Sequence, residues 1–235
     1  MPVVTHAQRQ NTPVYAVPFF GALAPLTQHT CPRALACNKI SPCPGLTKPF
    51  TKKTVACFDG GNFILGGLTL NEPSYIDFGL ELVAGCRETY TQTATKIGPE
   101  SFRWLGENSP ANATAPPGNE TFYERAGFWI DSANYVLRPE VIESYYYAYR
   151  ATGDTKYQDW AWEAYLAINE TCRVGSGYSA INDVNVPGGG GFADFQESFW
   201  FAEVLKYSYL IHAEVSFNPF SFQPVGYRAS RPADV

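Results

Sequence analysis

Residues 137–168 decide the fold class, and they read LRPEVIESYYYAYRATGDTKYQDWAWEAYLAI. Pro139 can open a helix, because the first N–H groups of a helix have no intrahelical partners. Gly153 predicts the end of that helix, since glycine readily adopts the left-handed conformation found there. From residue 157 to residue 168 apolar side chains recur at helical spacing, which predicts a second, amphipathic helix. Two helices joined by so short a turn indicate an antiparallel hairpin.

Cap signals mark this turn and the starts of other helices. Asp154 or Thr155 is expected to cap the second helix, and Thr155 with Gln158 matches the capping-box pattern. Residues 71–73, Asn-Glu-Pro, predict a further helix start, and a last helix is expected from about residue 195 to residue 212. No segment alternates cleanly as a strand would. The predicted class is therefore all-α, built from antiparallel helical hairpins.

The chain divides into three segments that differ in composition and in hydrophobic periodicity. Residues 1–54 hold many prolines and three of the six cysteines without periodicity, so we expect an atypical leader. Residues 55–213 carry the helical periodicity, and residues 214–235 are expected to form an atypical tail. Within the helical part, residues 97–122 are rich in Pro, Gly, Asn and Ser, which predicts a surface loop.

Composition narrows the class of ligand. The chain has 235 residues, of which 45% are hydrophobic, so it can bury a core. Its net charge is −5, and its 17 Lys and Arg residues form no basic stripe. Nucleic acid is therefore not an expected partner. The 15% share of aromatic residues suits a neutral sugar ligand, and it suits an ordinary core as well.

The cysteines and sequons point to the secretory pathway. The six cysteines match no zinc-ligand spacing. Three Asn-x-Thr sequons, at Asn112, Asn119 and Asn169, favour glycosylation in the compartment where disulfides persist. No segment predicts a transmembrane helix. The sequence leaves open the pairing of Cys31, Cys37, Cys43 and Cys172.

Four carboxylates are expected in helices beside apolar or aromatic residues: Glu140, Glu143, Glu197 and Glu203. Phe199 and Glu203 stand four residues apart, so an aromatic ring and a carboxylate share one helix face. Glycoside hydrolysis needs two carboxyl groups, one that protonates the leaving oxygen and one that activates water or attacks. Clustered carboxylates also bind calcium, and glutamates near a helix N-terminus also simply stabilise the helix dipole. The spacing alone leaves these interpretations open.

Three motifs stand in a fixed order along the chain. Residues 135–144, which include Arg138-Pro-Glu140, are similar to the motif R-P-E-x-x-E-S. Residues 196–210 are similar to E-S-F-x-x-A-E-T-L-K-Y-x-Y-L, and residues 56–67 are similar to L-x-C-F-x-G-G-x-x-x-L-G. In this order the motifs resemble the class I α-1,2-mannosidases, glycoside hydrolase family 47, and their fungal members in particular.

The resemblance implies a fold and a reaction. The fold would be an incomplete (αα)₇ barrel, with residues 55–213 as the C-terminal part of the catalytic domain. Glu140 would be the general base of an inverting hydrolase that removes terminal α-1,2-linked mannose from high-mannose N-glycans. The implied substrate-binding residues are Arg138, Glu143, Glu197, Phe199 and Glu203.

The resemblance also implies the supporting features. Calcium would be the cofactor, with some of the acidic residues holding its bound waters. Cys57 and Cys86 fall where the family's disulfide cysteines lie. The protein would be a monomer in the endoplasmic reticulum or Golgi, or secreted.

The chain departs from the family pattern at both ends. Nothing in residues 1–54 resembles the half of the family domain that carries the general acid. The closing Thr-Glu-Ala-His-Pro motif, whose threonine binds calcium directly, has no counterpart here. We therefore predict a truncated form with little or no hydrolase activity on its own. The alternatives are a catalytically silent mannose-glycan-binding protein of the same fold and a fragment without a ligand.

Overall fold

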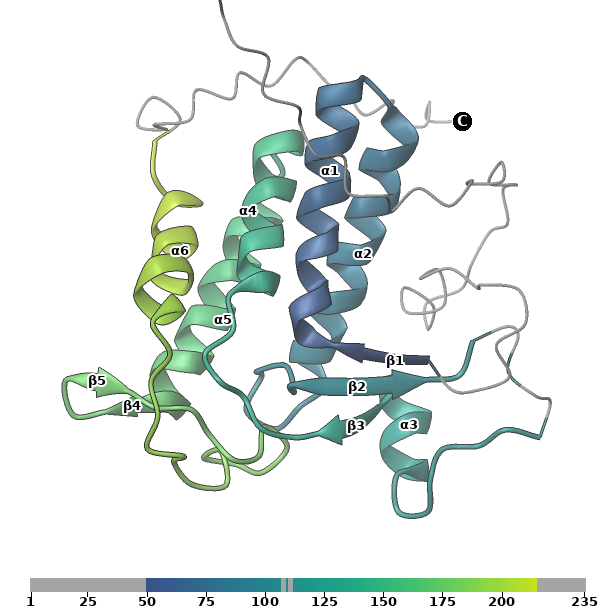
Figure 1. The fold of residues 1–235 in the computed structure, drawn as a ribbon, viewed down its shortest axis with the longest axis vertical. Coiled ribbons are helices and arrows are strands. Elements are labelled where there is room, and N and C mark those ends of the chain that lie inside the picture. Colours follow the sequence, from purple (N-terminus) through teal and green to yellow (C-terminus); the bar gives the residue numbers. More distant parts are fainter. Residues whose placement is uncertain (1–49, 107–108, 110–111, 215–235) are drawn as a thin grey trace, which may run out of the picture. The chain divides into compact units, whose positions relative to one another are not determined.

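Two antiparallel helical hairpins form the centre of the structure (Figure 1). The computed structural model describes residues 50–106, 109 and 112–214. The first hairpin consists of α1 (Asp59–Leu70) and α2 (Pro73–Thr91), and a short 3-10 helix (Thr54–Phe58) precedes it. The second consists of α4 (Glu140–Thr152) and α5 (Lys156–Cys172). Helix α4 packs against α1, α2 and α5, so it lies at the middle of the helical layer.

The predicted turn of the second hairpin is confirmed, but its predicted capping box is wrong. Gly153 ends α4 with φ of 70°, a left-handed conformation that a glycine adopts without strain. Asp154 supplies the cap, because its Oδ1 accepts a 3.0 Å hydrogen bond from the N–H of Lys156. The Thr155 side chain caps nothing. Gln158 does not bond back to the start of α5, because its Nε2 donates to the carbonyl oxygen of Ile211 instead.

The first hairpin depends on glycines at its helix contacts. A Cβ on Gly61 of α1 would stand 2.6 Å from Cδ2 of Tyr147, and one on Gly79 of α2 would stand 2.8 Å from the carbonyl oxygen of Gly60. Glycine is a poor helix former, so the residues of α1 do not by themselves predict a helix. Close packing overrides that preference here. Between α2 and the 3-10 helix, Cys57 and Cys86 form the disulfide that the resemblance implied.

The last helical segment begins later than predicted, and only its second part is α-helical. It comprises a π-helix (Trp200–Leu205, labelled η2) followed by α6 (Lys206–Leu210). Residues 195–197 precede the helix, so the predicted start near residue 195 is wrong. Glu197 consequently lies in a loop, where its carbonyl oxygen accepts a hydrogen bond from the N–H of Trp200. The π-helix widens the turn between Phe199 and Glu203.

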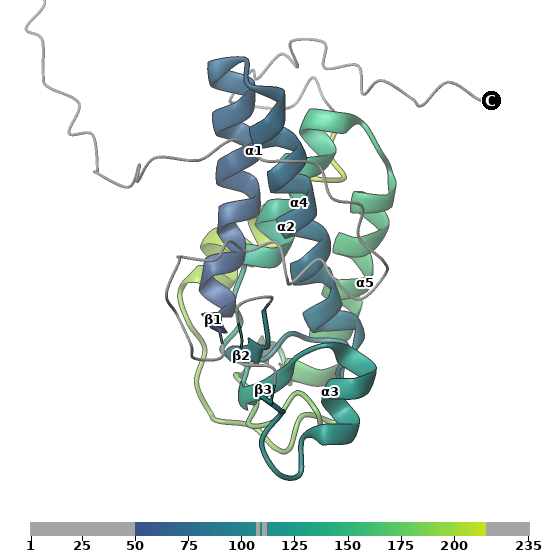
Figure 2. The ribbon, with the colours of Figure 1, turned by 90° about the vertical axis from the view of Figure 1, so that its right-hand side faces the viewer.

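Short strands lie at one end of the helices, which the two views of Figures 1 and 2 both show. Strands β1 (Phe50–Lys53), β2 (Ser101–Trp104) and β3 (Trp129–Ser132) pair antiparallel in that order. A helix α3 (Glu120–Ala126) precedes β3, and a small hairpin joins β4 (Arg173–Val174) to β5 (Gly177–Tyr178). The fold remains mainly helical, as predicted.

The prediction that residues 97–122 form a surface loop is wrong in its first part. Ile97, Phe102 and Trp104 are buried, and the last two pack with Phe128 in a cluster of their own. Gly and Pro surround this strand, and its four residues are too few to show an alternating pattern. Tertiary burial, which local composition does not reveal, decides its structure.

Several predictions concern residues outside the described part. The leader predicted for residues 1–54 is described only from residue 50, and the tail predicted for residues 214–235 only at residue 214. Cys31, Cys37 and Cys43 also lie outside it. Within the described part, Cys172 is a buried free thiol. None of the helices there combines the length and apolar character needed to cross a lipid bilayer.

Candidate active site

Glu140 is the first residue of α4, and its side chain is only 11% exposed. Its Oε2 atom is buried and has no hydrogen-bond partner. Burial raises the pKa of this carboxyl above its ordinary value of 4.5, because the charged form loses its hydration. The charges of Glu203 and Glu143 raise it further, whereas the backbone N–H of Glu140 and the guanidinium of Arg138 lower it. The site therefore holds a buried carboxylate oxygen that is free to accept a proton.

The chain enters α4 through a constrained segment. Leu137 is fully buried in the left-handed region with φ of 61°, which a branched side chain rarely adopts. Tyr135 pairs with Ile181 through two backbone hydrogen bonds, and its hydroxyl donates to the carbonyl oxygen of Arg138. These contacts set the direction in which Arg138 and Glu140 leave the backbone. The strain at Leu137 is thus located where the site residues begin.

Arg138 is held by a carboxylate that the motifs did not indicate. Its Nε and Nη2 donate to Oε2 and Oε1 of Glu100, each at 2.7 Å. Its Nη1 lies 3.7 Å from Oε1 of Glu140, and its guanidinium carbon lies 5.9 Å from the ring centre of Phe199. Hydrogen bonding to Glu100 raises the pKa of Arg138. The structure therefore brings Arg138, Glu140 and Phe199 together.

Glu143 and Glu203 are two further carboxylates whose charges act on Glu140. Oε1 of Glu143 accepts a 2.7 Å hydrogen bond from the hydroxyl of Tyr207. Burial raises the pKa of Glu143, this hydrogen bond lowers it, and the charge of Glu203 raises it again. The carboxylates of α4 and η2 therefore repel each other. Such like-charge grouping opposes folding, and groups of this kind occur preferentially at functional sites.

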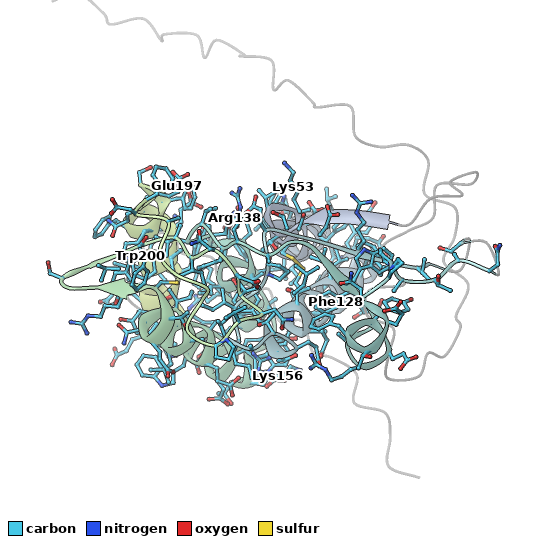
Figure 3. All side chains as sticks on the ribbon, turned by 90° about the horizontal axis from the view of Figure 1, so that it is seen from below. Lys53, Phe128, Arg138, Lys156, Glu197 and Trp200 are labelled. Carbon is cyan, nitrogen blue, oxygen red and sulfur yellow. A yellow bond between two sulfur atoms is a disulfide. The ribbon has the colours of Figure 1, made fainter. Side chains whose placement is uncertain are left out.

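Glu197 lies outside the helices, unlike Glu140, Glu143 and Glu203. It is half-buried in the loop before η2, and its charge contributes to the raised pKa of Arg138. Figure 3 views the end of the helices where the strands lie, and there Arg138 and Glu197 lie toward the same edge of the molecule. The carboxylate is close enough to Arg138 to influence it. The sequence predicted Glu197 on the last helix, but the structure places it in the loop before that helix.

Two further residues belong to this group and were missed. Glu100 follows Gly98-Pro99, in a segment that composition assigned to a surface loop. Tyr207 is one of fifteen tyrosines, and only the fold places its hydroxyl on Glu143. Neither residue carries a local signal, because both act across distances of 38 and 64 residues along the chain.

No calcium site forms from the described side chains alone. Within residues 50–106, 109 and 112–214, no three His, Cys, Asp or Glu side chains gather as metal ligands. Calcium prefers six to eight oxygen ligands. The carboxylates of Glu140, Glu143 and Glu203 influence one another without forming such a cage. The donor set present here does not fit the cation by itself.

A separate cavity lies away from these residues. A cavity of about 610 Å³ opens between α2 and α5 and contains none of the predicted site residues. Two of its polar side chains, Arg87 and Glu163, form an ion pair with each other. This cavity is therefore separate from the carboxylates at the start of α4.

The three sequons lie in different settings. Asn112 is in an exposed turn, and Asn119 is the residue just before α3, where its side chain makes no capping hydrogen bond. Asn169 is in the last turns of α5, where its Oδ1 accepts a 2.6 Å hydrogen bond from the hydroxyl of Tyr178. An attached glycan at Asn169 would have to preserve or replace that contact.

Comparison with known proteins points to one family. The sequence profile described as glycosyl hydrolase family 47 matches residues 38–222. A probable mannosyl-oligosaccharide alpha-1,2-mannosidase 1B of Aspergillus clavatus is 58% identical over 160 residues, which cover 68% of this chain and 30% of that protein. A mannosyl-oligosaccharide alpha-1,2-mannosidase of Penicillium citrinum is 56% identical over 160 residues, with the same coverage.

A solved structure matches the fold. The alpha-1,2-mannosidase from Trichoderma reesei superposes with a TM-score of 0.68 and 56% identity, covering 70% of this chain and 34% of that one. The described helical hairpins therefore correspond to part of an (αα)₇ barrel. The chain spans about a third of the length of the relatives that it matches.

Proposed function

The chain belongs to glycosyl hydrolase family 47, and on this premise we propose that its residues 55–213 are the C-terminal part of a mannosidase catalytic domain. The proposed reaction is the inverting removal of terminal α-1,2-linked mannose from high-mannose N-glycans. The printed names of the relatives support this reaction, and the 56–58% identity supports a shared site.

The observation that carries the proposal is the environment of Glu140. A general base must offer an unoccupied oxygen, and its efficiency increases as its pKa approaches the working pH. Oε2 of Glu140 is buried without a partner, and burial raises the pKa of this carboxyl. We assign to Glu140 the removal of a proton from the attacking water.

The neighbouring residues receive substrate-binding roles. Arg138 has N–H donors for sugar hydroxyls, and the ring of Phe199 beside it offers an apolar surface for a sugar face. Glu203, Glu143 and Glu197 are assigned to sugar hydroxyls or their bound waters. An inverting enzyme also needs a general acid, with the two carboxyl groups roughly 6.5–9.5 Å apart. We assign that acid to a part of the family domain that has no counterpart among the described residues.

Calcium belongs to the proposal only for the whole family domain. Bound to such a site, it would coordinate sugar hydroxyls and support distortion of the ring. The described residues do not supply enough ligands for it. We derive no step from it.

The setting of the protein follows from the same proposal. A chain that trims N-glycans works in the endoplasmic reticulum or Golgi, or after secretion, as a monomer. The disulfide between Cys57 and Cys86 suits that oxidising compartment. Asn112, Asn119 and Asn169 are the proposed glycosylation sites.

A chimera tests the proposal. The matching 160 residues of this chain replace their counterparts in the Penicillium citrinum enzyme, and mannose release from α-1,2-linked mannobiose is measured. We expect hydrolysis by the chimera. Glu140→Gln should lower kcat by a factor of about 10² to 10⁴, as loss of a general base does, with KM changed only a few-fold.

The control in the chimera is Glu163→Gln, which breaks the ion pair with Arg87 that lines the separate cavity. It should leave kcat unchanged. Unchanged turnover in the Glu140→Gln chimera would remove Glu140 from the mechanism. A chimera that binds mannobiose without hydrolysing it would instead favour a silent glycan-binding protein.

A further inference from the structure

Glu100 is a carboxylate whose backbone is fixed on both sides. Its N–H donates to the carbonyl oxygen of Asn134 at 2.8 Å, and its carbonyl oxygen accepts from the N–H of Thr54 at 2.9 Å. These bonds tie it to the segments that precede the first helix and follow β3. Its side chain is only 16% exposed. Glu100 therefore presents a carboxylate whose position does not depend on the helices of the site.

The Glu100 carboxylate engages Arg138 through two parallel hydrogen bonds. Two bonds at 2.7 Å, from Nε and Nη2, match the planar fork of a guanidinium to both oxygens of one carboxylate. The Arg138 side chain is 23% exposed, so solvent screens this pair less than a surface pair. Two of the five N–H donors of Arg138 are used here. The remaining donors are on Nη1 and Nη2.

The free edge of Arg138 faces the proposed base. Nη1 lies 3.7 Å from Oε1 of Glu140, too far for a hydrogen bond. The two glutamates therefore compete for one guanidinium, and Glu100 holds it. If Glu100 released it, the guanidinium could move onto Glu140 and occupy the carboxylate whose Oε2 is now without a partner.

We propose that Glu100 is a positioning residue of the site, which anchors the guanidinium of Arg138 so that its free donors remain available to the sugar while Oε2 of Glu140 keeps no hydrogen-bond partner. The substrate part of this inference rests on the proposed function. Glu100 itself touches neither the water nor the sugar in this scheme. It acts by keeping the 3.7 Å contact between Arg138 and Glu140 from closing to a hydrogen bond.

Three charged side chains near Glu140 influence its pKa, and any test of the Glu100 role must account for them. Arg138 lies on the segment before α4, Glu143 lies on α4, and Glu203 lies on η2. Removing the charge of Glu100 alone would make the surroundings of Glu140 more positive, even without movement. A pKa measurement cannot separate that effect from repositioning. The decisive readout is the position of Arg138.

The first arm uses the full 235-residue chain without sugar. Glu100→Gln keeps the shape of the side chain but removes the charge, and Glu163→Gln is the matched control at the Arg87 pair. In Glu100→Gln, hydrogen exchange of the Arg138 Nε–H should become about tenfold faster or more, as expected for loss of a charge-assisted bond. A crystal structure of this variant should show Arg138 within hydrogen-bond distance of Glu140. Glu163→Gln should change neither.

The second arm measures binding of α-1,2-linked mannobiose by NMR titration of the same proteins. Glu100→Gln should weaken binding about fivefold or more, Glu100→Asp should restore part of the loss, and Glu163→Gln should have no effect. An Arg138 that keeps its place and its slow exchange in Glu100→Gln overturns the inference. Faster exchange with unchanged affinity overturns the substrate part. If the wild-type chain binds no mannobiose, the proposed function loses support, and the first arm still decides whether Glu100 holds Arg138 off Glu140.

Discussion

Ser144 joins the two hairpins, and Ser144→Ala is expected to destabilise the chain strongly. Its Oγ donates to the carbonyl oxygen of Cys57 at 2.7 Å and accepts from the N–H of Gly61 at 3.0 Å. The N–H of Gly61 belongs to the first turn of α1, and Cys57 lies in the 3-10 helix before it, so one hydroxyl of α4 holds the start of the first hairpin. Ser144 is 1% exposed, so water cannot replace the lost bonds without entering the contact.

The expected loss follows from the two groups left behind. A buried polar group without its partner costs about 1–3 kcal/mol, and two such groups with partial relaxation cost about 2–4 kcal/mol in total. Urea unfolding at pH 7 measures this, with a reduced midpoint and an unchanged m-value. Thr69→Ala is the control, because Thr69 is exposed and its hydroxyl only returns to Leu65 of the same helix.

Thr69→Ala should change the free energy of unfolding by no more than about 0.5 kcal/mol. A loss below about 1 kcal/mol for Ser144→Ala, or one equal to that of the control, would refute the reasoning. The two hydrogen bonds would then not connect the hairpins in solution. A changed m-value would show instead that the variant alters the compactness of one of the two states.

Three other changes test the disulfide and the electrostatics. Replacing both Cys57 and Cys86 by Ala should lower the free energy of unfolding by about 2–4 kcal/mol under oxidising conditions, because the bridge joins residues 29 positions apart. A reducing agent should lower the free energy of unfolding of the wild type to the level of the variant. Glu140→Gln should raise the melting temperature relative to the wild type, and this difference should grow as pH rises above 4.5; a difference independent of pH would contradict the raised pKa of Glu140. Tyr207→Phe should raise the pKa of Glu143 further, because a hydrogen bond to the charged form is lost; carboxyl NMR titration measures it, and a lower pKa would contradict the contact.

Periodicity and end signals were enough to predict the second hairpin. The apolar spacing of α5 and the glycine after α4 are local features, so they can be interpreted without knowledge of the fold. Helix α1 has four glycines among twelve residues, and propensity therefore opposes it. Its packing depends on Gly79 of α2, which lets the two helix backbones approach at Gly60, and on Gly61, which leaves room for the ring of Tyr147 from α4; neither contact can be read from one segment alone.

The candidate site likewise combines residues that a local motif predicts with residues that only the fold brings near. Arg138 and Glu140 are two residues apart, and one motif was enough to place them together. Glu100 meets Arg138 from a strand-forming segment whose own residues gave the wrong structural expectation. The π-helix likewise has no signal in the spacing of Phe199 and Glu203, because an ordinary α-helix fits the same apolar pattern. Contacts between segments distant in the sequence are decided by packing.

The electrostatics of the site oppose the stability of the fold. Glu140 and Glu143 both have pKa values raised chiefly by burial, so the folded state favours their protonated forms. A raised folded pKa contributes stability that is complete below the unfolded value and is lost as pH rises through the folded value. From about pH 4.5 upward, each carboxylate therefore makes the folded chain less stable. Glutamine would fill the same space without a charge, so stability alone would favour it at both positions. A fold that instead keeps ionisable side chains there, with Glu203 adding to the repulsion, gives up stability at these positions, which supports the proton-transfer and sugar-binding roles that we propose for them.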